Sequence, residues 1–198
     1  MKSLGVFALL LLMGCDSGPE LRRLPRDGII LAFGDSLTYG TGTDRDHSYP
    51  SVLARLTGRR VINDGIPGEV TRLGLVRLPK SLALHQPDLV ILVHGGNDTL
   101  RRLRASQTEE NLGQMVAAIR SAGADVVMMG VSGANLFLTA PDYYTDVAEE
   151  LEVPLDTEAI PQLMRDATMK SDRVHFNREG YAALAGAVMA LLERNGAL

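Results

Sequence analysis

The chain has 198 residues, of which 45% are hydrophobic and 22% are charged, a composition typical of one globular domain with its own core. A formal net charge of −4 argues against a nucleic-acid partner, because phosphate binding requires a basic face. The nearest approach to a basic cluster is Arg101, Arg102 and Arg104, a short run that is more often a solvated surface than a binding site. The single cysteine excludes an internal disulfide framework.

The N-terminal residues have the pattern of an export signal. Lys2 precedes an apolar run from Leu4 to Met13, and the small residue Gly14 follows it. This run is shorter than the roughly 20 apolar residues that cross a membrane. A basic start, a short apolar run and a small residue at its end predict a secretory signal peptide over residues 1–14.

The single cysteine, Cys15, comes directly after this run. The residues Leu12-Met13-Gly14-Cys15 resemble a bacterial lipobox, although Met13 is bulkier than the residue usual at that position. The resemblance implies that Cys15 is lipidated and becomes the first residue, and that this anchor holds an exported lipoprotein on the periplasmic side of a cell-envelope membrane. Residues 15–27 contain Gly, Pro and several charges and would form the tether. The alternatives are an ordinary cleaved signal and an uncleaved N-terminal anchor.

From Ile29 onward, short apolar runs alternate with longer amphipathic segments, the pattern of a parallel α/β sheet. Leu89–Val93 is uniformly aliphatic, which predicts a strand that is buried on both faces. Pro79 should kink or end the helix in which it lies. We expect one domain over residues 28–198, folded as a five-stranded, three-layer α/β/α sandwich. Its predicted strands are 29–33, 61–63, 89–93, 125–131 and 153–155, and its predicted helices are 49–56, 70–84, 107–122, 142–151 and 177–194.

Four polar segments follow predicted strands or precede the last helix. In open parallel α/β sheets, ligands bind at the carboxyl ends of the strands, where these segments should meet. Ser36 alone could be a helix N-cap and Gly65 a turn glycine. Asn97 could bond its own turn, and His175 could be a surface histidine. The segments are Gly34-Asp35-Ser36-Leu37, Asn63-Asp64-Gly65, Gly95-Gly96-Asn97-Asp98 and Asp172-Arg173-Val174-His175.

Together these segments supply the groups that acyl transfer requires. A neutral serine is a poor nucleophile, so a base must accept its proton and a third group must orient that base. His175 is the candidate base, since imidazole titrates near neutral pH. Asp172 lies three residues earlier, a spacing that lets a turn bring its carboxylate to Nδ1 and leave Nε2 toward Ser36. We therefore predict Ser36, Asp172 and His175 as catalytic residues.

The oxyanion that develops during acyl transfer needs fixed hydrogen-bond donors. Each donor is typically worth roughly 10²–10³ in rate, or about 3–4 kcal/mol. The backbone N–H groups of Ser36 and Gly65 and the side-chain amide of Asn97 can supply such donors. Gly65 suits this role because the absence of a side chain lets the substrate approach the backbone closely.

The order of these segments resembles the GDSL/SGNH hydrolase family. Gly-Asp-Ser-Leu stands at 34–37, a glycine in a second block, Gly-Gly-Asn-Asp at 95–98 and Asp-x-x-His at 172–175. The context is most similar to the branch of thioesterase I/lysophospholipase L1 and the arylesterases. The resemblance implies a flavodoxin-like sandwich and no metal or organic cofactor. An ordinary α/β-hydrolase is disfavoured, because Ser36 does not stand in a Gly-x-Ser-x-Gly turn.

The remaining polar residues near these segments have structural interpretations. Asp35 and Asp98 stand in turns that contain glycine, where a carboxylate more often bonds local backbone N–H groups than reacts. His94 ends a buried strand and should be a packed, hydrogen-bonded histidine rather than a second base. A further carboxylate near an oxyanion would be unfavourable, so Asp64 should point away from the site.

The sequence therefore predicts a serine hydrolase that cleaves carboxylic esters or thioesters through an acyl-enzyme on Ser36. Compatible substrates are aryl esters, short-to-medium acyl esters and lysophospholipids. The apolar loop 132–141, with Leu136, Phe137 and Leu138, either walls an acyl pocket or packs against the core. The alternatives are a carbohydrate O-acetylesterase acting on cell-envelope or plant polysaccharide and a structural envelope lipoprotein without enzymatic activity.

Overall fold

The computed structural model describes residues 19–132 and 138–198 of the chain. The signal peptide predicted over residues 1–14 and the predicted lipidation site Cys15 lie outside the described residues, as do Leu136 and Phe137 of the apolar loop. Within the part of the chain that the structure describes, no helix has the length and apolarity needed to span a membrane.

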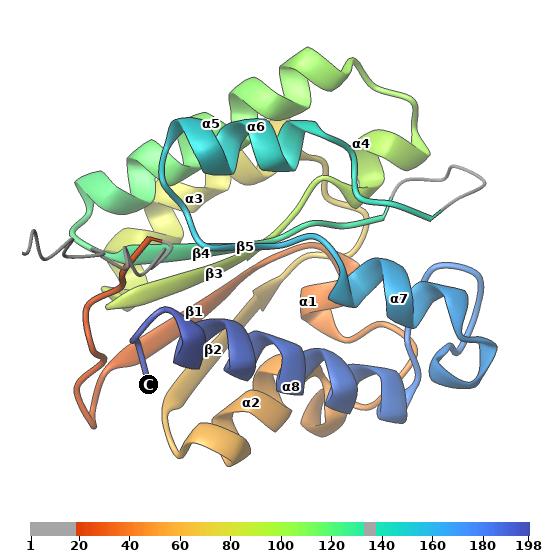
Figure 1. Cartoon of the computed structure of the whole chain (residues 1–198), viewed down its shortest axis with the longest axis horizontal. Coiled ribbons are helices and arrows are strands. Elements are labelled where there is room, and N and C mark those ends of the chain that lie inside the picture. Colours follow the sequence, from red (N-terminus) through yellow and green to blue (C-terminus); the bar gives the residue numbers. More distant parts are fainter. Residues whose placement is uncertain (1–18, 133–137) are drawn as a thin grey trace, which may run out of the picture.

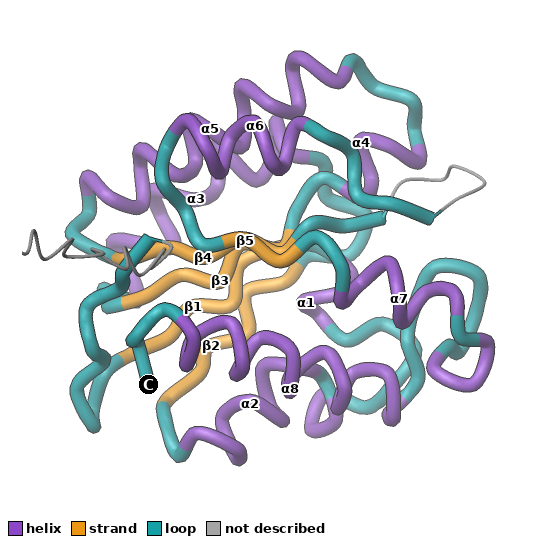
Figure 2. Tube along the Cα trace, in the orientation of Figure 1, coloured by secondary structure: helices purple, strands orange, loops and turns teal. Residues whose placement is uncertain are grey.

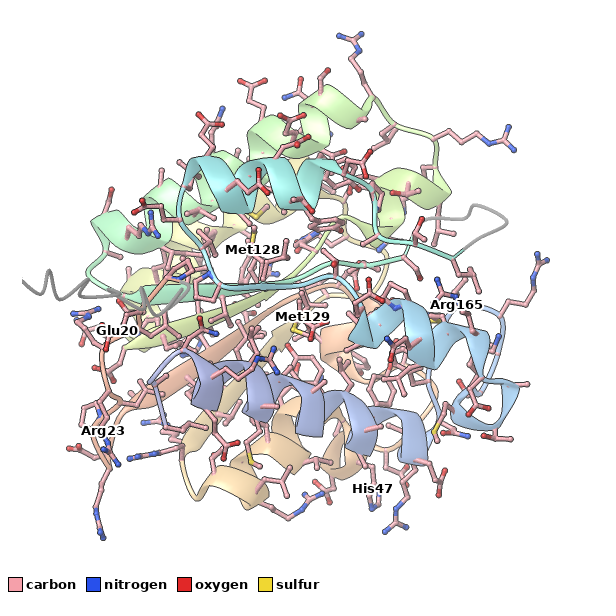
Figure 3. All side chains as sticks on the ribbon, viewed as in Figure 1. Glu20, Arg23, His47, Met128, Met129 and Arg165 are labelled. Atoms are coloured by element: carbon pink, nitrogen blue, oxygen red, sulfur yellow. The ribbon has the colours of Figure 1, made fainter. Side chains whose placement is uncertain are left out.

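A five-stranded parallel sheet forms the centre of the molecule (Figure 1). Its strands are β1 (Ile29–Gly34), β2 (Arg60–Gly65), β3 (Leu89–Val93), β4 (Asp125–Met129) and β5 (Leu155–Asp156). The order β2-β1-β3-β4-β5 puts the aliphatic strands β1 and β3 near the middle, and every residue of β3 is buried as expected. Met128 and Met129, adjacent on β4, point to opposite faces of the sheet, and both are buried (Figure 3).

Helices cover both faces of this sheet. They are α1 (Ser36–Tyr39), α2 (Tyr49–Thr57), α3 (Thr71–His85), α4 (Gly96–Leu100), α5 (Ala105–Ser121), α6 (Tyr143–Glu150), α7 (Ala159–Arg165) and α8 (Arg178–Arg194), with short 3-10 turns at Arg45–His47 and Ala167–Met169. The helices α3, α5 and α6 lie on one side of the sheet, and α1, α2, α7 and α8 lie on the other (Figure 2). The fold is the predicted three-layer α/β/α sandwich, while the short helices α1, α4 and α7 were not predicted.

The helix α3 continues through Pro79 to His85, so this proline does not end it. Proline removes one backbone hydrogen bond inside a helix. Leu78 and Leu82 are buried in the core, whereas Pro79 itself is exposed. The buried face of α3 therefore keeps the helix intact across the missing hydrogen bond.

The segment that precedes β1 packs against the domain, where we expected a free tether over residues 15–27. The N–H groups of Leu21 and Leu24 donate to carbonyl groups just after α8, at 2.8 and 2.9 Å. The side chain of Leu24 is buried, and Arg22 forms a 3.0 Å ion pair with Asp125 at the start of β4. These contacts make the second half of the expected tether part of the domain, at the amino ends of the strands.

Candidate active site

The loop after β1 and the loop before α8 meet at the carboxyl ends of the strands. Ser36 and His175 lie 139 positions apart in the sequence, yet Ser36 Oγ is 3.0 Å from His175 Nε2. On the other side of the ring, His175 Nδ1 is 2.8 Å from Asp172 Oδ2. The structure thus brings together the three residues predicted for catalysis, at distances that permit proton transfer.

Local hydrogen bonds hold the Asp172 carboxylate beside His175. Asp172 Oδ1 accepts the backbone N–H groups of Val174 and His175, at 2.8 and 2.9 Å, and the buried Phe176 anchors the next position of the loop in the core. Partial burial raises the pKa of Asp172, but the hydrogen bonds from Val174 and His175 outweigh it, so that the pKa lies below the usual range of aspartate. The ionised carboxylate accepts the Nδ1 proton, which leaves Nε2 free to accept the hydroxyl proton of Ser36.

Asp35 stiffens the turn that presents Ser36. Its Oδ1 accepts the N–H of Leu37 at 3.1 Å and so caps α1, while its Oδ2 accepts the side-chain amide of Asn97 at 3.0 Å. Burial raises the pKa of Asp35, although its hydrogen bonds oppose this shift. The contacts agree with the supporting role that the sequence indicated.

Two of the predicted oxyanion donors lie at the site. The contact with Asp35 orients the amide of Asn97 and uses one of its two N–H groups, so that the other is available to a substrate. The backbone N–H of Ser36 forms no hydrogen bond with another described residue. Both residues line the same cavity as His175.

The third predicted donor, Gly65, does not lie at the site. Its N–H donates to Asn63 Oδ1 at 3.2 Å, and the residue is absent from the cavity wall. A Cβ atom at this position would overlap the backbone nitrogen of Tyr39. The glycine is required for the close approach of β2 to α1, and its expected role in the oxyanion site is wrong.

Gly68, which the sequence reasoning missed, takes the place expected for Gly65. The residues from Ile66 to Glu69 form a turn closed by a 3.2 Å bond from the Glu69 N–H to the Ile66 carbonyl. Gly68 has a φ of 77° and follows Pro67, the pairing typical of a type II turn. The N–H of Gly68 donates to no other described residue, and Gly68 lines the cavity. The Pro-Gly dipeptide was the signal that could have indicated this turn.

A cavity of about 780 Å³ opens beside Ser36, within the range that accommodates small organic ligands. Most of its wall is apolar, and Leu138 of the predicted loop lines it while also packing against the core. Arg173 is a cationic group on the same wall. The apolar side chains that line the cavity are Leu37, Pro67, Leu100, Val131, Leu138, Met164 and Val174.

Comparisons with known proteins agree with this geometry. Residues 32–183 match the model of the GDSL-like lipase/acylhydrolase family. The chain belongs to this family. It is 30% identical over 168 residues to thioesterase 1/protease 1/lysophospholipase L1 of Escherichia coli K12, covering 79% of each protein. It is 37% identical over 139 residues to the arylesterase of Vibrio mimicus, covering 64% of this chain and 68% of that one. The crystal structure of TesA has a TM-score of 0.73 and 27% identity, covering 83% of this chain and 98% of that one.

The protein is thus a GDSL-type carboxylic ester hydrolase. The other polar residues that the sequence placed near the site are buried or form contacts within the protein. Asp98 accepts the backbone N–H and the hydroxyl of Thr71, at 2.9 and 2.6 Å. His94 is fully buried, as the sequence indicated. Asp64 pairs with Arg77 at 2.7 Å, which directs its carboxylate away from the oxyanion groups.

The exposed arginine run of this GDSL hydrolase has one contact with the site. The side chains of Arg101, Arg102 and Arg104 are exposed, as expected for a solvated surface. Arg101 Nη2 nevertheless donates to the carbonyl oxygen of Gly68 at 2.8 Å. Arg101, at the end of α4, therefore fixes the turn that carries Gly68, in addition to the hydrogen bond within that turn.

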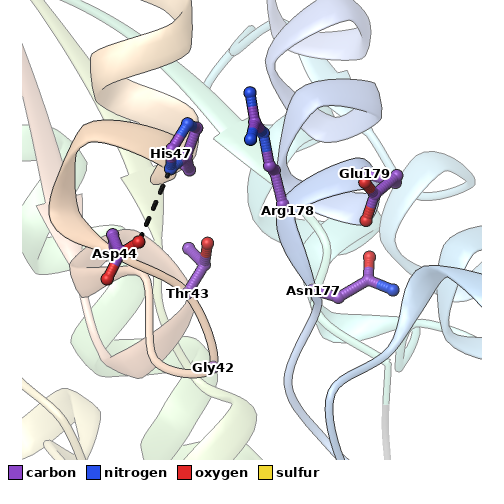
Figure 4. A pocket seen from close by; sticks show the side chains of 7 residues that line it. All are labelled: Gly42, Thr43, Asp44, His47, Asn177, Arg178 and Glu179. Carbon is purple, nitrogen blue, oxygen red and sulfur yellow. Dashed lines mark ion pairs between the residues drawn. The ribbon is translucent and has the colours of Figure 1, made fainter.

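A second hollow in the GDSL hydrolase, of about 610 Å³, lies between residues 42–47 and the first turn of α8 (Figure 4). His47 Nδ1 is 3.9 Å from Asp44 Oδ2 there, but the wall contains no serine or cysteine that the histidine could activate. Over residues 19–132 and 138–198, no three His, Cys, Asp or Glu side chains gather in a way that could hold a metal ion. The hollow is lined by Gly42, Thr43, Asp44, His47, Asn177, Arg178 and Glu179.

Proposed function

We propose that this hydrolase cleaves aryl esters, short-to-medium acyl esters, thioesters or lysophospholipids through an acyl-enzyme on Ser36. The observation that carries the proposal is the hydrogen-bonded series of Ser36, His175 and Asp172, with Ser36 Oγ 3.0 Å from His175 Nε2. The names of the relatives support the choice of substrates, since one is a thioesterase and lysophospholipase and another is an arylesterase.

In the acylation step, Ser36 Oγ attacks the carbonyl carbon while His175 Nε2 accepts the hydroxyl proton. The carbonyl oxygen becomes an oxyanion and accepts hydrogen bonds from the N–H groups of Ser36 and Gly68 and from the Asn97 amide. The C–O or C–S bond then breaks, and His175 gives the proton to the leaving alcohol or thiol. Asp172 stabilises the imidazolium while His175 carries the proton.

In the deacylation step, water replaces the departed alcohol or thiol. His175 takes a proton from this water as its oxygen attacks the acyl carbonyl, and the same donors hold the second oxyanion. The bond between the acyl carbon and Ser36 Oγ then breaks, the acid leaves, and the proton returns to Ser36. No group other than water is consumed.

The cavity wall supports substrates that combine an apolar chain with a polar or anionic part. The apolar side chains of Leu138 and Met164 stand on the wall of the cavity that contains Ser36, where they would contact an acyl chain. Arg173 has no ion-pair partner among the described residues and lines the same cavity. Its guanidinium would pair with the phosphate of a lysophospholipid or the carboxylate of a product.

The test is a comparison of the wild type with Ser36→Ala. The wild type should hydrolyse p-nitrophenyl butyrate and react with a fluorophosphonate probe, and Ser36→Ala should do neither while keeping its circular dichroism spectrum. Ser106→Ala, at an exposed position on α5, is the matched control and should behave as the wild type. Normal turnover by Ser36→Ala would reject the mechanism, and a wild type without turnover or labelling would instead indicate a structural lipoprotein.

A chain-length series separates the proposed substrates from the acetylesterase alternative. Turnover of p-nitrophenyl esters should rise from acetyl to medium-chain acyl groups, because longer chains bury more apolar surface in the cavity. Hydrolysis of lysophosphatidylcholine should accompany it. Acetyl release from xylan or peptidoglycan, together with a strict preference for the acetyl ester, would replace this assignment by a carbohydrate O-acetylesterase.

We also propose that the protein is exported and anchored by lipid on Cys15, on the periplasmic side of the cell envelope. The support is the resemblance of residues 12–15 to a lipobox after a short apolar run. Cells that express the wild type and are fed an alkynyl fatty acid should show a labelled protein in the membrane fraction. Cys15→Ser should remove the label and release the protein, and a label that persists in this variant would reject the anchor.

A further inference from the structure

A group of charged and polar side chains is buried directly behind the oxyanion groups. We call Asp64, Glu69, Arg77 and His94 the charged cluster. The side chains of Glu69 and His94 are 6% and 0% exposed, and that of Arg77 is 17% exposed. Buried charges are costly unless their partners are fixed with good geometry. The presence of the charged cluster behind the oxyanion groups therefore indicates that the positions of these groups must be fixed.

Arg77 is the centre of the charged cluster. Its Nε and Nη2 atoms donate to the two carboxylate oxygens of Glu69 at 2.9 and 2.7 Å, and its Nη1 lies 2.7 Å from Asp64 Oδ1. Its guanidinium stacks on the ring of Phe33 at 4.0 Å. Nη2 also lies 3.5 Å from the carbonyl oxygen of Gly34, two residues before the nucleophile.

His94 connects Glu69 to the segment that carries Asn97. The N–H of Gly95 donates to His94 Nδ1 at 3.1 Å, so Nδ1 has no proton and Nε2 has one. Nε2 lies 3.2 Å from Glu69 Oε2 and donates to it, which makes the ring a neutral donor. A Cβ on Gly74 would overlap His94 Nε2, so α3 accommodates this ring only with a glycine at that position.

The charged cluster therefore joins the segments that carry the three oxyanion donors. Glu69 follows Gly68 directly and closes its turn, His94 leads through two glycines to Asn97, and Arg77 reaches the carbonyl before Asp35 and Ser36. We propose that Glu69, Arg77 and His94 are positioning residues that set the distance between the Gly68 N–H and the Asn97 amide, and so control transition-state stabilisation rather than substrate binding. This inference rests on the proposed function.

The substitution Glu69→Gln tests this geometry most directly. Its side chain keeps the shape of glutamate, but in either orientation its NH₂ group faces an N–H group of Arg77, and in one of them it also faces His94 Nε2. At least one contact therefore becomes repulsive and the adjoining turn shifts. Loss of a whole oxyanion donor costs roughly 10²–10³ in rate. A displaced donor should lower kcat by about tenfold to a hundredfold, with KM within about threefold of the wild-type value.

The experiment measures kcat and KM of p-nitrophenyl butyrate hydrolysis for wild type, Glu69→Gln, His94→Gln and His94→Leu. His94→Gln still offers an amide N–H to Glu69 and should keep more activity than His94→Leu. Inhibition by an alkylboronic acid, which mimics the tetrahedral state, should weaken in proportion to kcat/KM, while inhibition by butyrate should stay unchanged. Asp125→Asn is the control, because it removes an ion pair to Arg22 at the opposite edge of the sheet.

The outcomes separate this inference from the proposed function. A wild type without turnover or fluorophosphonate labelling overturns both. An active wild type with Glu69→Gln at wild-type kcat overturns only the positioning role, and so does a loss of butyrate and boronate binding in parallel. If Glu69→Gln does not fold, the two His94 variants carry the test, and equal kcat values for the glutamine and leucine variants overturn the inference.

Discussion

Replacing Asp172 with asparagine should reverse the tautomer of His175 and leave the protein folded. Asp172 Oδ1 accepts the backbone N–H groups of Val174 and His175, at 2.8 and 2.9 Å, and asparagine keeps both bonds only if its carbonyl oxygen takes that place. Its NH₂ group then faces His175 Nδ1, where Asp172 Oδ2 lies at 2.8 Å. Nδ1 becomes an acceptor, so Nε2 carries the proton and cannot accept the hydroxyl proton of Ser36.

A base in the wrong tautomer lowers kcat by on the order of 10⁴, or roughly 5.4 kcal/mol of transition-state stabilisation. KM should change little, because Asp172 does not line the cavity. Steady-state kinetics with p-nitrophenyl butyrate measures both constants, and thermal melting checks the fold. Asp166→Asn is the matched control, since Asp166 accepts the backbone N–H of Thr168 at 2.8 Å in a neighbouring turn. A folded Asp172→Asn variant with kcat within tenfold of the wild type would refute the reasoning.

Further substitutions examine the oxyanion donors and the charged cluster. Asn97→Ala should lower kcat by about 10²–10³ with little change in KM in steady-state assays, and an unchanged kcat would remove Asn97 from the donors. Gly65→Ala should lower the melting temperature, because its Cβ overlaps the backbone of Tyr39, while wild-type stability with a reduced kcat would return Gly65 to the site. Burial raises the pKa of Glu69, but the bonds from His94 and Arg77 lower it below the ordinary value of 4.5. The ionised Glu69 carboxylate therefore stabilises the fold fully above pH 4.5, and this stabilisation is lost as the pH falls through the lower folded-state pKa. The melting temperature of Glu69→Gln should fall less between neutral and acidic pH than that of the wild type. Equal pH dependence of the two melting temperatures would contradict the shift.

The sheet and the convergence of Ser36, Asp172 and His175 could be predicted because their signals are local. Aliphatic runs marked the strands, and parallel topology placed the residues that follow them at one edge. The three-residue spacing of Asp172 and His175 confined the carboxylate and the imidazole to one loop. Only the distance from this loop to Ser36 depended on the whole fold.

Gly68 could not be recognised in the same way, because its contribution is a backbone N–H that every residue except proline has. The Pro67-Gly68 dipeptide indicates a turn, but only the folded chain, with a φ of 77° at Gly68, shows that this turn lies at the cavity. Gly65 fits the expected role only because glycine permits close approach to its backbone. The structure shows that the group approaching Gly65 is the backbone of Tyr39 and not a substrate.

Contacts between residues that are distant in the sequence could not be predicted, for a different reason. The hydrogen bonds of Arg22 to Asp125 span 103 positions, and those of Arg77 to Gly34 span 43, so no periodicity or short motif marks them. The continuation of α3 through Pro79 likewise depends on the packing of Leu78 and Leu82, which outweighs a local helix-breaking signal.

The docking of Leu21 and Leu24 near the C-terminus has a consequence for how the enzyme would face its surroundings. This segment lies at the amino ends of the strands, whereas Ser36 and Asn97 of the catalytic cavity follow the carboxyl ends of β1 and β3 (Figure 1). With a lipid on Cys15, residues 15–20 would reach at most about 20 Å, less than the roughly 40 Å diameter of a domain of this size. The opening of the cavity would then face the aqueous compartment and not the membrane. The enzyme would hydrolyse dissolved esters and lipid monomers, and it would not reach the lipids of the bilayer to which it is anchored.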